Sequence, residues 1–200
     1  SSYLKQNYPN TKSDMSTVFM EKAFDFCRST GMISMINIPV WMFLTSYEKL
    51  RKNIIQNKTI INMLHFGRGV FGSDFGTTSF VISNVKIKQY IGIYRKLYQK
   101  HGAVDNVERK EEWFFENMGY FKAQQDEFSK IPGNTIAYWA TPQTIKSFEN
   151  LLCKDYKANA GISTGNNEKY IFYWHEVPFN KICTEEVARD GYDYFPLSKG

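Results

Sequence analysis

The feature that most constrains the fold is an alternation of helical and strand-like hydrophobic patterns. Apolar residues recur at offsets of three and four in residues 14–28 and again in residues 47–55, a spacing that favours helices. Short apolar runs, typical of strands, lie at residues 32–38, 59–66 and 77–85. The order helix, strand, helix, strand, loop, strand predicts an open α/β sheet.

Local signals refine these elements. Ser13 is a suitable N-cap for the first helix, and Gly31 is suited to end it. Its apolar stripe is predicted to consist of Met15, Val18, Phe19, Ala23, Phe26 and Cys27. Thr45 and Glu48 have the capping-box spacing for the second helix. The run at residues 32–38 is predicted to be a strand buried on both faces, as in a parallel sheet.

The pattern changes after residue 85. Residues 90–98 read as one more strand, and residues 104–117 as a charged amphipathic helix. A boundary is expected near residues 131–133. Beyond it we expect a helix after Thr141 and short aromatic strands such as residues 169–174.

Composition and charge limit the kinds of partner and the cellular location expected of this chain. The net charge of +5 suits a polyanion only modestly, and the 16% of aromatic residues exceeds what a core of this size needs. The longest apolar run, residues 32–44, is too short to span a bilayer, and no signal-peptide pattern is present. The three cysteines lack C-x-x-C spacing, and His175, Glu176, Cys183 and Asp190 have no metal-ligand spacing. We expect a cytoplasmic protein without a metal site, membrane segment or disulfide.

Four segments resemble gamma-type DNA adenine-N6 methyltransferases. Residues 12–23 (KSDMSTVFMEKA) resemble the helix after the catalytic N-P-P-Y loop of that family, and residues 32–42 (MISMINIPVWM) its next strand and exit loop. Residues 46–51 and 64–82 are similar to the remaining helix and strands, in the order of the family. The whole chain most resembles the phage-exclusion (BREX) PglX kind and fused restriction-modification methylases.

The resemblance implies a class I, Rossmann-like methyltransferase fold. Residues 1–98 would be the C-terminal half of the catalytic sheet, residues 99–130 a helical connector, and residues 131–200 the beginning of an α+β target-recognition domain. The parent protein would transfer a methyl group from S-adenosylmethionine to N6 of an adenine flipped out of double-stranded DNA.

Two motifs of the family are absent from this sequence. Neither the Gly-rich S-adenosylmethionine loop nor N-P-P-Y occurs in the 200 residues. We therefore expect a fragment that needs the N-terminal half of the same polypeptide and is inactive alone, with no catalytic residue of its own.

The resemblance also assigns site residues, each with a simpler alternative. Phe71 would stack on the flipped adenine, or fold back on the core. Asp14, Pro39 and Trp41 would form walls of the cofactor pocket; alternatively, Asp14 would cap its helix, the reading that the sequence favours, and Trp41 would close the core. Arg68 would hold phosphate or be a solvated surface cation. In the turn at residues 161–167, Thr164 and Asn167 are assigned to DNA contact.

Two other functions stay open at this point. A non-catalytic DNA-recognition or adaptor protein would keep the fold and lose the chemistry. An unrelated nucleotide-binding domain fits the sheet alone, but the sequence contains no phosphate-binding loop.

Overall fold

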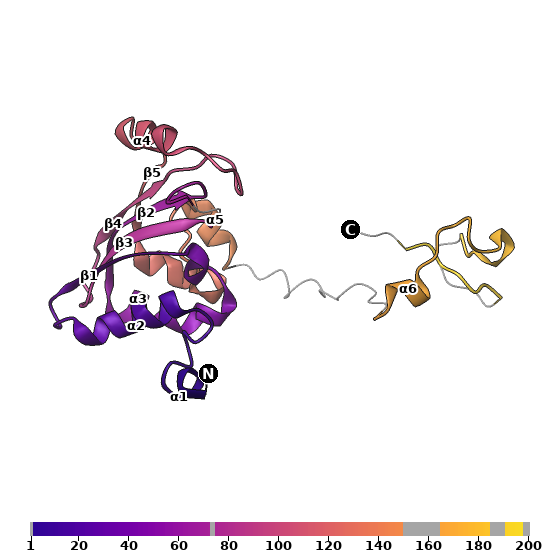
Figure 1. The fold of residues 1–200 in the computed structure, drawn as a ribbon, viewed down its shortest axis with the longest axis horizontal. Coiled ribbons are helices and arrows are strands. Elements are labelled where there is room, and N and C mark those ends of the chain that lie inside the picture. The colour runs from indigo at the N-terminus through magenta and orange to yellow at the C-terminus, as the bar shows by residue number, and fades with distance from the viewer. Residues whose placement is uncertain (1, 73–74, 150–164, 185–190, 198–200) are drawn as a thin grey trace. The chain divides into compact units, whose positions relative to one another are not determined.

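The computed structural model describes residues 2–72, 75–149, 165–184 and 191–197. The chain divides into two compact units, residues 1–152 and residues 153–200. We call them the core unit and the C-terminal unit, and each is described by itself (Figure 1).

The core unit is built on a five-stranded sheet with the order β1-β3-β2-β4-β5. The strands are β1 (Met32–Asn37), β2 (Thr59–Gly67), β3 (Thr77–Ser83), β4 (Ile91–Lys96) and β5 (Tyr120–Gln124). β3 runs antiparallel to both β1 and β2, whereas β4 is parallel to β2 and antiparallel to β5. β1, β2 and β4 therefore point the same way, and their carboxyl ends lie at one edge of the sheet, which we call the carboxyl edge.

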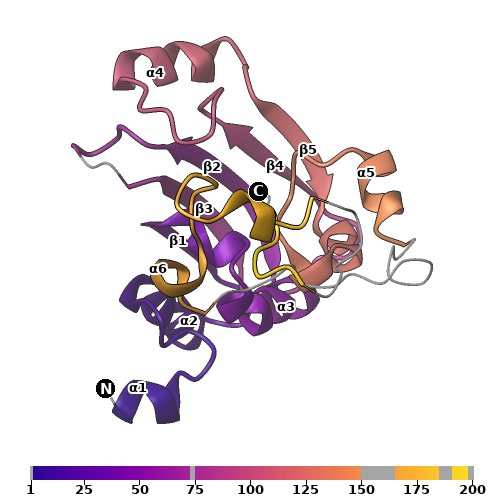
Figure 2. The same ribbon diagram turned by 90° about the vertical axis from the view of Figure 1, so that its right-hand side faces the viewer.

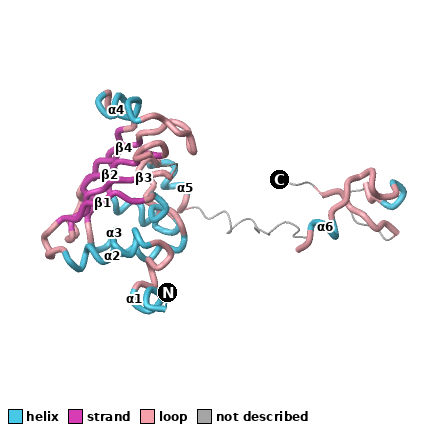
Figure 3. Tube along the Cα trace, in the orientation of Figure 1, coloured by secondary structure: helices cyan, strands magenta, loops and turns pink. Residues whose placement is uncertain are grey.

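The helices are α1 (Ser2–Asn7), α2 (Met15–Phe26), α3 (Glu48–Asn57), α4 (Val107–Phe115), α5 (Pro142–Ser147) and, in the C-terminal unit, α6 (Asn167–Tyr170). Short 3₁₀ helices are η1 (Pro39–Met42), η2 (Thr45–Tyr47), η3 (Gln125–Lys130), η4 (Pro132–Asn134) and η6 (Phe179–Lys181). α2 packs on β1 and α3 on β2, so both cover the same face of the sheet (Figures 1 and 3). Figure 2 shows α4 beyond the ends of β2 and β4.

The core lies between the sheet and the face of α2 and α3 that meets it. Fully buried members include Met20, Trp41, Ile54, Met63, Phe80 and Ile136. Tyr94 stacks on Tyr138 with ring centroids 5.0 Å apart, which ties β4 to the segment before α5. This packing extends past residue 131, so the predicted boundary there does not separate compact units. The functional labels given to residues 1–98, 99–130 and 131–200 stay predictions.

The α/β class predicted from the alternation is confirmed, as are the strands at β1 to β4 and the helices at α2 to α5. The prediction that residues 32–38 form a strand buried on both faces in a parallel arrangement is wrong. β1 pairs only with the antiparallel β3 in the described part, and burial alternates along it: Met32 is 62% exposed and Ile33 7%. Apolar residues on both faces of the strand made it look like a central one.

The predicted apolar stripe of α2 is also rotated from the observed one. Thr17, Val18, Met20 and Phe24 are buried, whereas Met15, Phe19 and Phe26 are 51%, 59% and 79% exposed. Apolar residues surround this helix, so spacing alone did not identify the side that meets the sheet.

Helix ends differ from expectation as well. Asp14, not Ser13, caps α2, and the helix ends at Phe26 before Gly31 is reached. The capping box at Thr45 does not form, because residues 45–47 make η2 and α3 begins at Glu48 without a side-chain cap.

One strand was not predicted, and one predicted strand is not formed. β5 is a short, half-exposed edge strand that pairs only with β4 in the described part, so it lacks the longer apolar run by which the other strands were predicted. The strand predicted at residues 169–174 is not formed. Instead, Asn166 Oδ1 accepts a hydrogen bond from Lys169 N and starts α6.

Candidate functional site

Three loops meet at the carboxyl edge. Pro39 follows β1, the Gly-rich loop of residues 67–76 follows β2, and residues 97–106 follow β4. In open α/β sheets, ligands bind outside the carboxyl ends of the strands. The sheet therefore brings the predicted site residues Pro39, Arg68 and Phe71 to one edge, as the rule leads us to expect.

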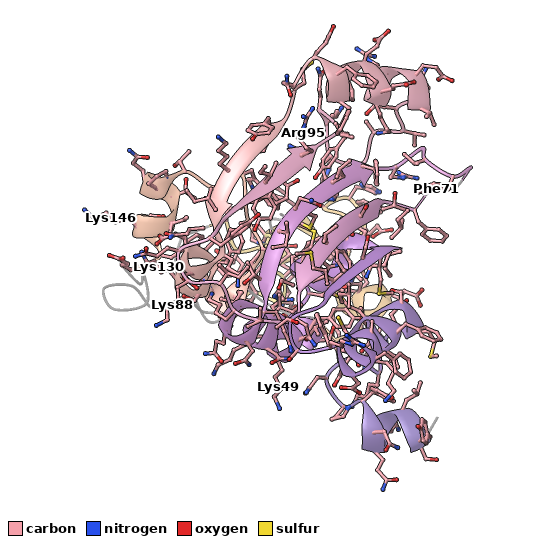
Figure 4. All side chains as sticks on the ribbon, turned by 90° about the vertical axis from the view of Figure 1, so that its left-hand side faces the viewer. Lys49, Phe71, Lys88, Arg95, Lys130 and Lys146 are labelled. Atoms are coloured by element: carbon pink, nitrogen blue, oxygen red, sulfur yellow. The ribbon has the colours of Figure 1, made fainter. Side chains whose placement is uncertain are left out.

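Phe71 is held in an unusual backbone conformation. Its φ is +61° and that of the following Gly72 is +65°, in the left-handed region that non-glycine residues rarely adopt. The side chain is 65% exposed and contacts the ring of Phe66 edge-on, with centroids 6.4 Å apart. Figure 4 shows Phe71 on the loop, with Lys88, Lys130 and Lys146 toward the opposite end of the sheet. Phe71 thus offers an exposed aromatic face at the carboxyl edge.

The base of the Gly-rich loop fits closely against residues 97–106. Arg68 Nη1 donates a hydrogen bond to Gly102 O at 3.0 Å. Gly69 has a φ of +90°, and a Cβ there would lie 2.3 Å from Asp105 O, so only glycine fits this approach. Arg68 therefore holds the Gly-rich loop to residues 97–106, a role that the sequence did not indicate. Its predicted contact with phosphate stays a prediction.

Lys110 of α4 joins the same region from the side. Its Nζ donates to Phe66 O at 2.8 Å and to Leu97 O at 2.9 Å, the carbonyls at the ends of β2 and β4. The side chain is 3% exposed, and burial lowers its pKa while nearby Asp105 raises it. A buried cation thus links two strand ends beside the loop.

Arg95 fastens the other end of α4. Its Nη2 donates to Trp113 O at 3.1 Å and to Phe114 O at 2.5 Å, and its Nη1 donates to Asn117 Oδ1 at 3.1 Å. These acceptors lie at the C-terminal end of α4, where a cation is favourable. Sequence reasoning missed Lys110 and Arg95, because a lysine in a charged helix and an arginine in a strand look like solvent-facing residues.

The residues predicted as cofactor walls have clear structural roles. Trp41 is fully buried; its ring contacts Phe80 edge-on, and its Nε1 donates to Asn37 Oδ1 at 3.0 Å. Asn37 Oδ1 also accepts from Thr78 Oγ1 at 3.0 Å, so Asn37, which the sequence did not single out, links the ends of β1 and β3. Pro39 lies at the base of the Gly-rich loop, 3.4 Å from where a Cβ of Gly76 would be.

Asp14 acts as the N-cap of α2. Its Oδ1 accepts hydrogen bonds from Ser16 N at 2.7 Å and Ser16 Oγ at 2.5 Å. This geometry favours the capping alternative, while the assignment of Asp14 and Trp41 to a cofactor wall stays a prediction.

The two residues assigned to DNA contact belong to the C-terminal unit. Thr164 lies outside the described residues, and Asn167 is the first residue of α6. A cavity of about 590 Å³ in this unit is lined by aromatic side chains that include Phe172, Trp174 and Tyr194.

Among the residues that the structure describes, no three His, Cys, Asp or Glu side chains are placed to hold a metal ion. None of the helices in the described ranges is long and apolar enough to cross a membrane.

His65 is a buried titratable group in β2. Its Nδ1 lies 3.2 Å from Tyr138 Oη, and burial, with smaller effects from Lys96 and His101, lowers the pKa of His65 to about 4. Because an unfolded histidine titrates near 6.5, the unfolded state takes up the proton first as the pH falls. The free energy of unfolding should therefore fall between pH 6.5 and 4, and at pH 4.5 it should be about 2–3 kcal/mol lower than at neutral pH.

Urea unfolding of the chain at pH 7 and pH 4.5 measures this loss. The matched control is a His65→Gln variant, which cannot titrate and should lose about 2–3 kcal/mol less than the wild type over the same interval. Equal losses in the two proteins would contradict the assignment of the effect to His65.

The chain is similar in sequence to several known proteins. Residues 1–71 match the model of the Eco57I restriction-modification methylase family. The adenine-specific methyltransferase BrxX of Escherichia coli O9:H4 (strain HS) is 35% identical over 204 residues, covering 99% of this chain and 16% of BrxX. The chain is homologous to adenine-specific methyltransferases. PglX of Lacticaseibacillus casei (strain Zhang), also an adenine-specific methyltransferase, is 34% identical, covering 99% of this chain and 17% of PglX.

The resemblance to adenine-specific methyltransferases drawn from the sequence is thereby confirmed, and so is the similarity to the PglX kind. The chain spans about one sixth of the length of these relatives. Among solved structures, the methyltransferase subunit of a type I restriction-modification system from Streptococcus thermophilus is similar, with a TM-score of 0.47 and 11% identity over 67% of this chain and 33% of that one.

Proposed function

We propose that the protein containing this chain is a site-specific DNA adenine-N6 methyltransferase of a BREX or restriction-modification system, and that residues 1–98 form the later half of its catalytic sheet. The observation that carries this proposal is homology along 99% of the chain to two adenine-specific methyltransferases. The carboxyl edge supports it, because it presents an exposed aromatic ring where α/β enzymes bind their substrates.

The role proposed for this chain is capture of the target base. An adenine leaves the DNA helix at a cost of a few kcal/mol in lost stacking and pairing. Stacking on an aromatic side chain returns about 1–3 kcal/mol per base. Phe71 supports this role because its ring is exposed and glycines at positions 69 and 72 leave room for DNA to approach the backbone.

The proposed methyl donor is S-adenosylmethionine, but the residues at this edge do not by themselves fit it. Of the three assigned wall residues, Asp14 has one carboxylate oxygen engaged in capping by Ser16, and the Trp41 ring is fully buried, which leaves Pro39 and the second Asp14 oxygen as the surface they offer a cofactor. The binding loop and the catalytic loop are therefore assigned to another part of the polypeptide, and no chemical step is derived from residues 1–200.

Exposed apolar surface supports a contact with that other part. Met15, Phe19 and Phe26 on α2 and Met32 and Ile36 on β1 are each more than half exposed. Strands and helices of α/β enzymes normally bury such residues against neighbouring elements. We assign these exposed faces of α2 and β1 to contacts with the N-terminal half of the catalytic domain, and residues 131–200, with Thr164 and Asn167, to the start of DNA recognition.

Methyl transfer by the full-length protein tests the proposal. Purified protein is incubated with unmethylated bacterial genomic DNA and S-adenosylmethionine carrying a labelled methyl group. The DNA is then digested to nucleosides and analysed by mass spectrometry. Labelled N6-methyl-2′-deoxyadenosine is expected. DNA binding without any labelled N6-methyl-2′-deoxyadenosine would instead favour the non-catalytic recognition or adaptor function.

Replacing Phe71 with Ala should slow methylation by the full-length protein about tenfold. This corresponds to a loss of about 1.4 kcal/mol of transition-state stabilisation, within the range for one lost stacking interaction. Stability should change little, because the side chain is largely exposed. Initial rates and the thermal midpoint are measured on the same preparations.

Phe75 provides the matched control, since it lies in the same loop and is 73% exposed. Phe75→Ala should leave the rate within about twofold of the wild type, less than 0.5 kcal/mol. A lowered thermal midpoint with an unchanged rate in Phe71→Ala would show that Phe71 serves the fold and not the base.

A further inference from the structure

The Gly-rich loop is supported by polar contacts as well as by the buried side chain of Val70. Between α4 and the strand ends lies an open groove of about 440 Å³, lined by apolar side chains that include Phe66, Val70, Leu97 and Phe114. Beside this groove, polar contacts add to the packing of Leu97 and Trp113 in fixing α4 against the strand ends.

Lys110 supplies the central contact. Its side chain is 3% exposed, and its ammonium group donates to Phe66 O and Leu97 O. Phe66 immediately precedes the loop, and its ring is the one that contacts Phe71. Hydrogen bonds from a buried cation to carbonyl oxygens are among the stronger ones in proteins, and they hold both strand ends in one geometry.

The contacts around Lys110 continue the same support toward the loop. Asp105, 3.9 Å from Lys110 Nζ, has its carbonyl oxygen against Gly69. Arg68 donates to Gly102 on the same segment. The path from Lys110 to Phe71 therefore runs through Phe66 on one side and through residues 102–105 and Gly69 on the other.

We propose that Lys110 is a positioning residue for base capture: its bonds to the ends of β2 and β4 hold the Gly-rich loop so that Phe71 faces the flipped adenine. The proposal rests on the proposed function for its catalytic consequence. The placement of Phe71 is a separate consequence that can be measured without activity. Lys110 touches no substrate in this proposal and acts only through Phe71.

The activity test is a double-mutant cycle in the full-length protein. Lys110→Met keeps the length of the side chain and removes its charge and its donors. We expect it to lower kcat/KM for methylation about tenfold, as Phe71→Ala does. The double variant should also be about tenfold slower, because both changes remove the same interaction. A loss of about a hundredfold in the double variant, the product of independent effects, would overturn the proposal.

Gln125→Ala is the matched control for general destabilisation. Gln125 is also buried and polar, but it binds Ile60 N at 2.7 Å and Lys58 O at 2.7 Å, at the start of β2 away from the loop. We expect this variant to lower the thermal midpoint while kcat/KM stays within about twofold. A tenfold loss there would show that any damage to β2 slows the enzyme, which overturns a specific role for Lys110.

The placement test places 4-fluorophenylalanine at position 71 and records its fluorine NMR resonance in the full-length protein. Lys110→Met should shift or broaden the resonance, and Gln125→Ala should leave it unchanged. Gly69→Ala should also move it, since the new Cβ would meet Asp105 O; this variant carries the test if Lys110→Met does not fold. An unmoved resonance in folded Lys110→Met or Gly69→Ala overturns the proposal, even if the protein shows no methyl transfer.

Discussion

Replacing Trp41 with Ala is expected to lower the free energy of unfolding by about 3–5 kcal/mol, the usual cost of removing a large buried aromatic side chain. The ring is fully buried, packs on Phe80, and donates to Asn37. The variant would lose this packing and leave a cavity at the end of β1. Urea unfolding of the chain should show a lower midpoint with an unchanged slope.

Trp139 is the matched control, because it is the same residue type but 41% exposed. Trp139→Ala should cost well under half as much. The pair also separates the two roles considered for Trp41. If Trp41 were mainly a wall of the cofactor pocket, its replacement would keep the urea midpoint and weaken binding of S-adenosylmethionine by the full-length protein.

Replacing Arg51 with Met is expected to lower the free energy of unfolding by about 3 kcal/mol or more. Arg51 is fully buried in α3, and its guanidinium donates to Trp41 O, Leu44 O and Gly133 O at 2.6–2.9 Å. Methionine keeps the volume but leaves three carbonyl oxygens without this donor, at about 1–3 kcal/mol each when they stay buried. Burial lowers the pKa of Arg51, but an arginine remains charged at neutral pH.

Lys49→Met on the same helix is the control, since Lys49 is exposed (Figure 4). Its urea midpoint should match the wild type within about 0.5 kcal/mol. An Arg51→Met variant as stable as Lys49→Met would show that water satisfies the three carbonyls and that the guanidinium is not needed. Otherwise Arg51 is the side chain that joins η1, α3 and η4.

The strands and the loop at the carboxyl edge could be predicted, because each of them has a local sequence pattern. Apolar spacing predicted β2 and β3, and the glycines between them predicted a loop. The backbone there needs positive φ at Gly67 and Gly69, which explains why glycine occurs at these positions. Phe71 was singled out by the family resemblance, and the structure leaves its ring exposed.

The supports of that edge could not be predicted in the same way. In the sequence, Lys110 and Arg51 look like solvated charges on helices. The farthest acceptor of Lys110 lies 44 residues away along the chain, and that of Arg51 lies 82 residues away. Trp41 fits a loop at a ligand site and a core position equally well by sequence. Only the packing of η1 against β3 decides that its ring is buried.

The sequence by itself determined the α/β class, the order of the elements and the methyltransferase resemblance, because these depend on residue spacing and on short motifs along the chain. Only the tertiary structure decided the antiparallel place of β3 between β1 and β2, the buried side of α2, and the cations that fasten α4 and α3. The physical reason is that strand pairing and burial depend on contacts between distant residues, and apolar residues on every side of an element satisfy several arrangements equally.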